Sequence, residues 1–147
     1  MADTGKLYYS TTAINTGGRE GESHLEDRSF EIKVSTPKKM GGPGQGTNPE
    51  QLFALGYSAC FNAALEHFME QEDMKNDTQV THTVKLLEDP SDNGFKLAVD
   101  IGVAIKDLDK EKVQEMADKA HGFCPYSKAT RGNIDVQVKA VPYEEGK

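Results

Sequence analysis

A strongly apolar segment runs over residues 52–69, where Leu, Phe, Ala and Gly dominate and almost no charge precedes Glu66. The segment has a clear helix start. Asn48 is a good N-cap, Pro49 suits the first helical position, and Gln51 completes a capping-box pattern. Because a helix that is apolar on all sides must be buried, we predict a central helix in the core.

Patterns typical of strands lie on both sides of this helix. Before it, residues 30–35 alternate apolar and polar side chains with a period of two, and residues 7–14 are rich in Tyr and Thr. After it, residues 80–87 and 95–105 flank a turn of Pro, Ser, Asp, Asn and Gly, which predicts a β-hairpin. Residues 134–138 alternate again and predict a last strand.

A second helix is expected between the hairpin and the last strand, beginning near Asp107 or Asp109. Gly122 ends this helix, and Pro125 prevents it from continuing. Its buried stripe follows the spacing i, i+3, i+4, i+7 and comprises Val113, Met116, Ala117 and Ala120. The order of strands, helix, strands, helix and strand predicts an α+β fold with antiparallel sheet.

Length and charge narrow the possible functions. The 147 residues fit a single domain over 1–147, and a modest core would gain from burial in an oligomer. A net charge of −7 argues against nucleic acid and against anionic membrane surfaces. No apolar run follows Met1 and no segment approaches the length of a membrane span, so we expect neither a secretory signal nor a transmembrane helix. These features favour the reducing cytoplasm, where a disulfide would be transient and catalytic.

The two cysteines of the chain, Cys60 and Cys124, lie in unusual settings. Cys60 is inside the apolar helix, and Cys124 follows the end of the second helix between Gly122 and Pro125. In the simplest interpretation both are inert, because free Cys is often buried and burial raises its pKa. In the alternative they form a reactive couple, in which Cys124 condenses with a sulfenic acid on Cys60.

A reactive Cys60 needs a cationic neighbour at neutral pH, and Arg19 in a glycine-rich turn is the best candidate. Glu50 would orient that guanidinium through a bidentate pair. Both residues also have ordinary interpretations, as an arginine at a hairpin tip and as a glutamate that meets a helix dipole. Along a straight helix, the Cα atoms of Glu50 and Cys60 lie roughly 15 Å apart. An extended arginine could nearly bridge this gap; otherwise the helix bends, or one residue comes from a second subunit.

The sequence gives little support to a metal site, a direct Cys–His pair or a phosphate-binding loop. The chain has no C-x-x-C motif, and the pair His121 and Cys124 does not make a zinc site, so we expect no metal. His67 lies about 10 Å along the helix axis from Cys60, too far for a direct pair. The glycines after Met40 lack the context of a phosphate-binding loop.

Several motifs, taken together and in this order, resemble the organic hydroperoxide resistance (Ohr) branch of the OsmC family. They are Gly17-Gly18-Arg19 and the segments 47–54, 56–61 and 120–133. The resemblance implies an OsmC-like α+β fold with antiparallel sheets packed around central helices, in an intertwined homodimer with active sites at the subunit interface. It also implies that Cys60 is the peroxidatic cysteine, that Cys124 resolves it, and that Arg19 and Glu50 activate it.

The activity that the resemblance implies is a thiol-dependent reduction of organic hydroperoxides to alcohols. No bound cofactor is expected, and the reductant would be an external dithiol such as dihydrolipoamide or a lipoylated protein. Phe53, Phe61 and Phe123 are candidate walls of a substrate pocket, although each could equally be ordinary core. The alternatives are a general OsmC-type peroxidase, a non-catalytic thiol redox sensor and a binder of hydrophobic ligands.

Overall fold

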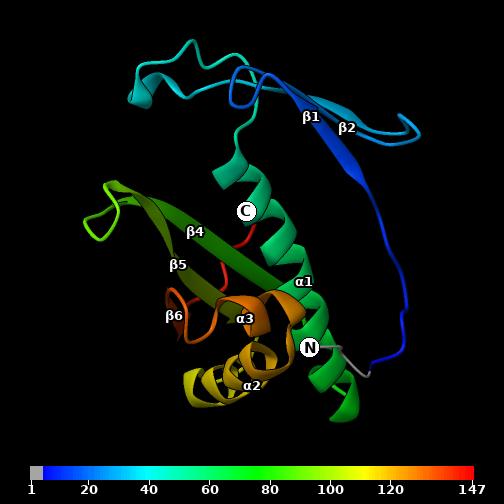
Figure 1. Ribbon diagram of the computed structural model, residues 1–147. Coiled ribbons are helices and arrows are strands. Elements are labelled where there is room, and N and C mark those ends of the chain that lie inside the picture. Colours follow the sequence, from blue (N-terminus) through cyan, green and yellow to red (C-terminus); the bar gives the residue numbers. More distant parts are fainter. Residues whose placement is uncertain (1–4) are drawn as a thin grey trace. The chain divides into compact units, whose positions relative to one another are not determined.

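The structure is a computed structural model that describes residues 5–147, and Figure 1 shows its elements in chain order. The chain divides into two compact units, of which the first ends at Pro49 and the second begins at Glu50. Each unit carries its own three-stranded sheet. The expectation of one domain over 1–147 stays a prediction.

The N-terminal unit is an antiparallel sheet in the order β1-β2-β3. Its elements are β1 (Ala13–Thr16), β2 (Gly21–Leu25), β3 (Glu31–Val34) and a 3-10 turn η1 (Lys38–Met40). The strand expected over 30–35 is confirmed by β3, but the one expected over 7–14 is mostly wrong. Ala13 pairs with Leu25, the last residue of β2, so the residues before Ala13 have no neighbouring strand in this sheet.

The C-terminal unit contains the apolar helix and the second sheet, in the order β4-β5-β6. Its elements are α1 (Pro49–Gln71), β4 (Thr78–Asp89), β5 (Gly94–Ile105), α2 (Lys110–Phe123), α3 (Pro125–Thr130) and β6 (Asp135–Ala140). The predicted hairpin is confirmed by the antiparallel pair β4 and β5. The pairing of β6 differs from the antiparallel expectation, because β6 runs parallel to β5. The helices α2 and α3 provide the crossover that a parallel neighbour requires.

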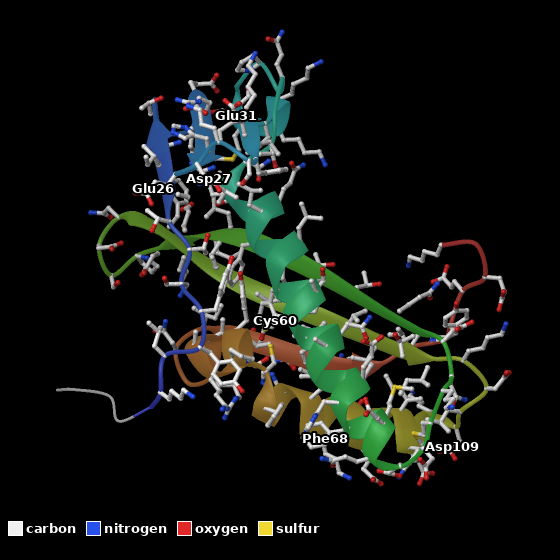
Figure 2. All side chains as sticks on the ribbon, turned by 90° about the vertical axis from the view of Figure 1, so that its right-hand side faces the viewer. Glu26, Asp27, Glu31, Cys60, Phe68 and Asp109 are labelled. Atoms are coloured by element: carbon white, nitrogen blue, oxygen red, sulfur yellow. The ribbon has the colours of Figure 1, made fainter. Side chains whose placement is uncertain are left out.

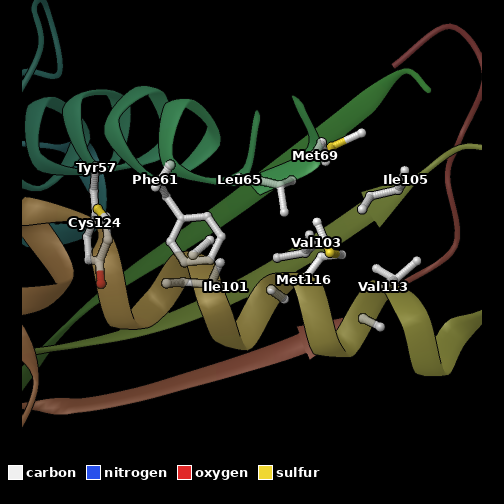
Figure 3. Packing of buried hydrophobic residues seen from close by; sticks show 14 of the residues in the cluster. Tyr57, Phe61, Leu65, Met69, Ile101, Val103, Ile105, Val113, Met116 and Cys124 are labelled. Carbon is white, nitrogen blue, oxygen red and sulfur yellow. The ribbon is translucent and has the colours of Figure 1, made fainter. Parts of the chain in front are cut away.

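The core of this unit lies between α1, α2 and β5, as Figure 3 shows. Helix α2 begins at the second of the two expected positions: the carboxylate of Asp109 caps it by accepting a hydrogen bond of 2.8 Å from the Lys112 N–H. The predicted stripe is buried along its whole length. Tyr57 and Cys124 lie at one end of the packed row, and Val113 lies at the other.

Helix α1 begins at Pro49, as predicted, and contains the whole apolar run, but within one chain it is buried on one face only. The buried side chains are Tyr57, Phe61, Ala64, Leu65 and Met69. Leu55 is 65% exposed, because the sheet and α2 cover a single side of a helix that is apolar all around. In the part of the chain that the structure describes, no helix has both the length and the hydropathy needed to cross a bilayer.

Candidate functional site

The structure brings the two cysteines together. Cys60 lies midway along α1 (Figure 2), and Cys124 lies at the junction of α2 and α3. Their sulfur atoms are 3.4 Å apart although the residues are 64 positions apart in sequence, and both are free thiols. A disulfide bond needs about 2.05 Å, so a shift of little more than 1 Å would join them.

The position of Cys124 depends on a helix that the sequence analysis missed. Cys124 is both the C-cap of α2, where its N–H donates to the Ala120 carbonyl at 2.8 Å, and the N-cap of α3. Pro125 does end α2, as expected, but it also occupies the first position of α3. Proline is favoured at that position because its missing N–H has no intrahelical partner there. A proline at this position is thus a signal both for the end of one helix and for the start of the next.

The surroundings of Cys60 act on its ionisation in two directions. Burial raises the pKa of the Cys60 thiol, and the neighbouring Cys124 thiol raises it further. The backbone N–H of Tyr126 donates to the Cys60 sulfur and lowers this pKa. The balance favours the neutral thiol, so a nucleophilic Cys60 needs an added positive charge.

The two residues expected to supply and orient that charge lie in different units. Arg19 is in the turn between β1 and β2, next to Gly17 and Gly18, whose positive φ angles of 86° and 62° favour glycine. Glu50 lies in the first turn of α1, ten residues before Cys60. The approach of Arg19 to Glu50 and Cys60 stays a prediction.

The three candidate pocket phenylalanines occupy three different environments. Phe61 is fully buried in the core. Phe53 is half-buried, with its ring centroid 6.1 Å from that of Tyr126. Phe123 is 45% exposed and stacks on His67 at 4.7 Å. Their role as pocket walls stays a prediction; Phe123 directly precedes Cys124 in the chain, and Phe53 contacts the ring of Tyr126 on α3.

Gly56 permits the approach of α3 to α1 beside Cys60. A Cβ atom at position 56 would lie 2.7 Å from the Tyr126 hydroxyl, closer than side-chain carbons come to other atoms. The ring of Tyr126 thus lies over the helix one turn before Cys60. A glycine inside a helix weakens the helix by about 1 kcal/mol, so it indicates a close contact of this kind.

A buried polar network, also missed from the sequence, lies beside Cys124. The hydroxyl of Tyr57 is 2.7 Å from that of Ser127 and 3.2 Å from that of Thr130. Nδ1 of His121 is 2.9 Å from the same Ser127 hydroxyl. Tyr57 and Ser127 are fully buried. Recognising α3 would have placed Ser127 and Thr130 on one helix face, because residues three apart are neighbours there.

The described residues contain no candidate metal cluster, and a cavity at the C-terminal end of α1 lies away from the cysteines. Among residues 5–147, no group of three His, Cys, Asp or Glu side chains could hold a metal ion. A cavity of about 920 Å³ opens at the C-terminal end of α1 and is lined by residues 62–78 in part and by Tyr143, without either cysteine.

His82 on β4 provides a pH-dependent test of this core. Its ring lies 4.5 Å from the ring of Tyr57, neither ring nitrogen has a hydrogen-bond partner in the described structure, and burial lowers its pKa to about 4. The unfolded chain binds the proton near pH 6.5, before the folded chain does. The free energy of unfolding should therefore fall by about 3 kcal/mol between pH 7 and pH 4 through this group alone.

The substitution His82→Phe should remove this contribution while keeping a ring in the core. Urea unfolding of both proteins at pH 7 and pH 4.5, at one protein concentration, measures the difference. The variant should lose less stability on acidification than the unchanged protein, and equal losses would contradict the prediction.

Comparisons with known proteins show which family the chain resembles. A family profile described as OsmC-like protein matches residues 42–139. Organic hydroperoxide resistance protein-like 2 of Staphylococcus epidermidis is 51% identical over 132 residues, which cover 88% of this chain and 93% of the relative. Organic hydroperoxide resistance protein OhrB of Bacillus subtilis is 47% identical over 123 residues, which cover 84% of this chain and 90% of the relative.

Solved structures show the same fold. The crystal structure of Bacillus subtilis OhrB matches with a TM-score of 0.82 and 44% identity, over 90% of this chain and 98% of that one. The crystal structure of a putative organic hydroperoxide resistance protein from Vibrio cholerae has captopril bound in one of the active sites. It matches with a TM-score of 0.87 and 41% identity, over 94% of this chain and 95% of that one. The expected OsmC-like α+β fold is confirmed. The chain therefore belongs to the OsmC-like family, within the branch of the organic hydroperoxide resistance proteins.

Proposed function

We propose that this protein is a thiol-dependent peroxidase that reduces organic hydroperoxides to alcohols. The observation that carries the proposal is the 3.4 Å separation of the Cys60 and Cys124 sulfurs, one half-buried and one fully buried, in the core of the C-terminal unit. Two thiols at this distance are suited to reversible oxidation. The names of the relatives indicate organic hydroperoxides as the oxidant.

The first half of the cycle oxidises Cys60. Its thiolate attacks the terminal oxygen of the hydroperoxide, an S–O bond forms, and the O–O bond breaks. The alkoxide takes a proton and leaves as the alcohol, and Cys60 is left as a sulfenic acid. Cys124, already adjacent, then attacks the Cys60 sulfur, so a disulfide forms and water leaves.

The second half of the cycle needs an external dithiol. One thiolate of dihydrolipoamide, or of a lipoylated protein, attacks the disulfide and forms a mixed disulfide. Its second thiol completes the exchange, which returns Cys60 and Cys124 to thiols and leaves the lipoyl group oxidised. No bound cofactor takes part in this scheme.

Arg19, oriented by Glu50, is proposed to supply the positive charge that ionises Cys60. The support is electrostatic: burial by itself raises the pKa of this thiol. In Arg19→Ala, the pKa of Cys60 should rise, and its alkylation rate at pH 7 should fall about 10- to 100-fold. The pH dependence of Cys60 alkylation, followed by mass spectrometry, measures the shift. The pKa of Cys60 in Arg19→Lys should lie between that of the unchanged protein and that of Arg19→Ala. A pH profile of Arg19→Ala equal to that of the unchanged protein would refute the role of Arg19.

A homodimer is the proposed assembly. Leu55 on the open face of α1 is 65% exposed, and Tyr8 before β1 is 95% exposed. Exposed apolar side chains on this scale indicate a surface that a partner covers. Light scattering coupled to gel filtration should give twice the chain mass, and a monomer at micromolar concentration would contradict the assignment.

The test of the function is steady-state peroxide consumption with dihydrolipoamide. An apolar site should favour alkyl or lipid hydroperoxides over hydrogen peroxide, because burial of apolar surface contributes about 25 cal/mol per Å². Equal turnover of both would indicate a general OsmC-type peroxidase. A single oxidation of each protein molecule, with no turnover, would indicate a redox sensor and would refute the proposal.

A further inference from the structure

We propose that Ser127 is a positioning residue for the reaction of Cys60. Through Tyr57 and His121, its hydroxyl holds α3 where the Tyr126 N–H and the Cys124 sulfur both face Cys60. This inference rests on the proposed peroxidase function, and it adds Ser127 to the residues on which the reaction of the two cysteines depends.

Helix α3 needs an external anchor. It has six residues, and a helix of this length does not persist in water by its own hydrogen bonds. Its N-cap, Cys124, makes no side-chain capping bond. The geometry around both sulfurs therefore depends on what ties α3 to the longer helices.

The network around Ser127 supplies that anchor. Its hydroxyl lies 2.7 Å from the Tyr57 hydroxyl on α1 and 2.9 Å from His121 Nδ1 on α2, so one side chain joins three helices. Thr130, at the end of α3, adds a second link to Tyr57 at 3.2 Å. Ser127 is fully buried, and hydrogen bonds out of water are strong and costly to leave unmade.

The anchored residue lies close in the chain to both groups that act on Cys60. Ser127 follows Tyr126, whose N–H donates to the Cys60 sulfur, and it lies three residues after Cys124. In the C-terminal unit this N–H lowers the pKa of Cys60, whereas burial and the Cys124 thiol raise it. A small rotation of α3 would weaken the N–H contact and lengthen the sulfur–sulfur distance at the same time.

The test compares Ser127→Ala and Tyr57→Phe with a matched control, Ser91→Ala. The control makes the same substitution in the β4–β5 turn, where the Ser91 hydroxyl bonds to Asp89 at 2.6 Å on the surface. Tyr57→Phe keeps the ring contacts and removes only the hydroxyl, so it reports on the network if Ser127→Ala folds poorly.

Two properties are measured for each variant and for the control, in the whole chain. The first is the midpoint of the pH dependence of Cys60 alkylation, measured where each variant is fully folded. The second is the ratio of sulfinic acid to disulfide after several equivalents of an alkyl hydroperoxide, because sulfinic acid needs two equivalents for each Cys60. In both variants the midpoint should rise by about half a pH unit, because the Tyr126 N–H contact with the Cys60 sulfur is weakened. The sulfinic fraction should rise several-fold, because Cys124 reacts more slowly with the Cys60 sulfenic acid.

Midpoints and product ratios equal to those of Ser91→Ala would overturn the inference and leave the network a purely structural one. The alkylation readout involves no peroxide. Absence of peroxide turnover in the unchanged protein would therefore refute the proposed function, whereas an unshifted midpoint in both variants would refute the role of Ser127.

Discussion

Replacement of Cys60 by serine should abolish peroxide consumption, with a loss of at least about 1,000-fold in turnover. A serine hydroxyl stays protonated at neutral pH in a setting where even the thiol pKa is raised by burial. It also cannot form a sulfenic acid, so the step that breaks the O–O bond has no nucleophile. Steady-state consumption of an alkyl hydroperoxide at saturating dihydrolipoamide measures the effect.

The fold should tolerate this change, since serine is close to cysteine in size and Cys60 is only half-buried. An unchanged thermal unfolding midpoint would show that the loss is chemical. Retention of more than a tenth of the turnover by the correctly folded variant would mean that Cys60 is not the attacking residue.

Replacement of Cys124 by serine should separate the first oxidation from the cycle. The variant should consume one equivalent of hydroperoxide quickly and then stop cycling, because Cys124 is no longer there to condense with the Cys60 sulfenic acid. Further peroxide should carry Cys60 to sulfinic acid, which dithiols do not reduce. Rapid mixing with one equivalent of peroxide, followed by mass spectrometry of the Cys60 peptide, measures the product.

The unchanged protein treated in the same way provides the comparison, and it should give the disulfide with Cys124. A variant that cycles with dihydrolipoamide as fast as the unchanged protein would show that Cys124 has no resolving role. The Cys60 peroxidatic assignment would stand in that case, because the two substitutions test different steps.

Local patterns were enough to predict most of the elements. The start of α1 at Pro49, the apolar run that follows it, and the stripe on α2 each lie within one segment, and the structure confirms them. The hairpin of β4 and β5 needed only two alternating runs and a turn. Propensity and periodicity act over a few residues, so a single sequence displays them directly.

Long-range arrangements were predicted less well, and each miss has a physical cause. Residues 7–12 have strand-like composition but no neighbouring strand in their unit, because β2 ends at Leu25. The parallel register of β6 follows from the crossover through α2 and α3, and its alternation is the same in either direction. Pro125 was interpreted as a helix stop when it also begins a helix.

The sequence by itself determined the family of this protein and which residues are the candidates for its chemistry: two thiols in apolar or helix-end settings, within motifs that identify the family. The tertiary structure decided the rest. It places sulfurs 64 residues apart within 3.4 Å and ties α3 to α1 and α2 through the hydroxyl of Ser127. Those distances depend on packing between segments far apart in the chain, and a linear pattern carries no measure of such packing.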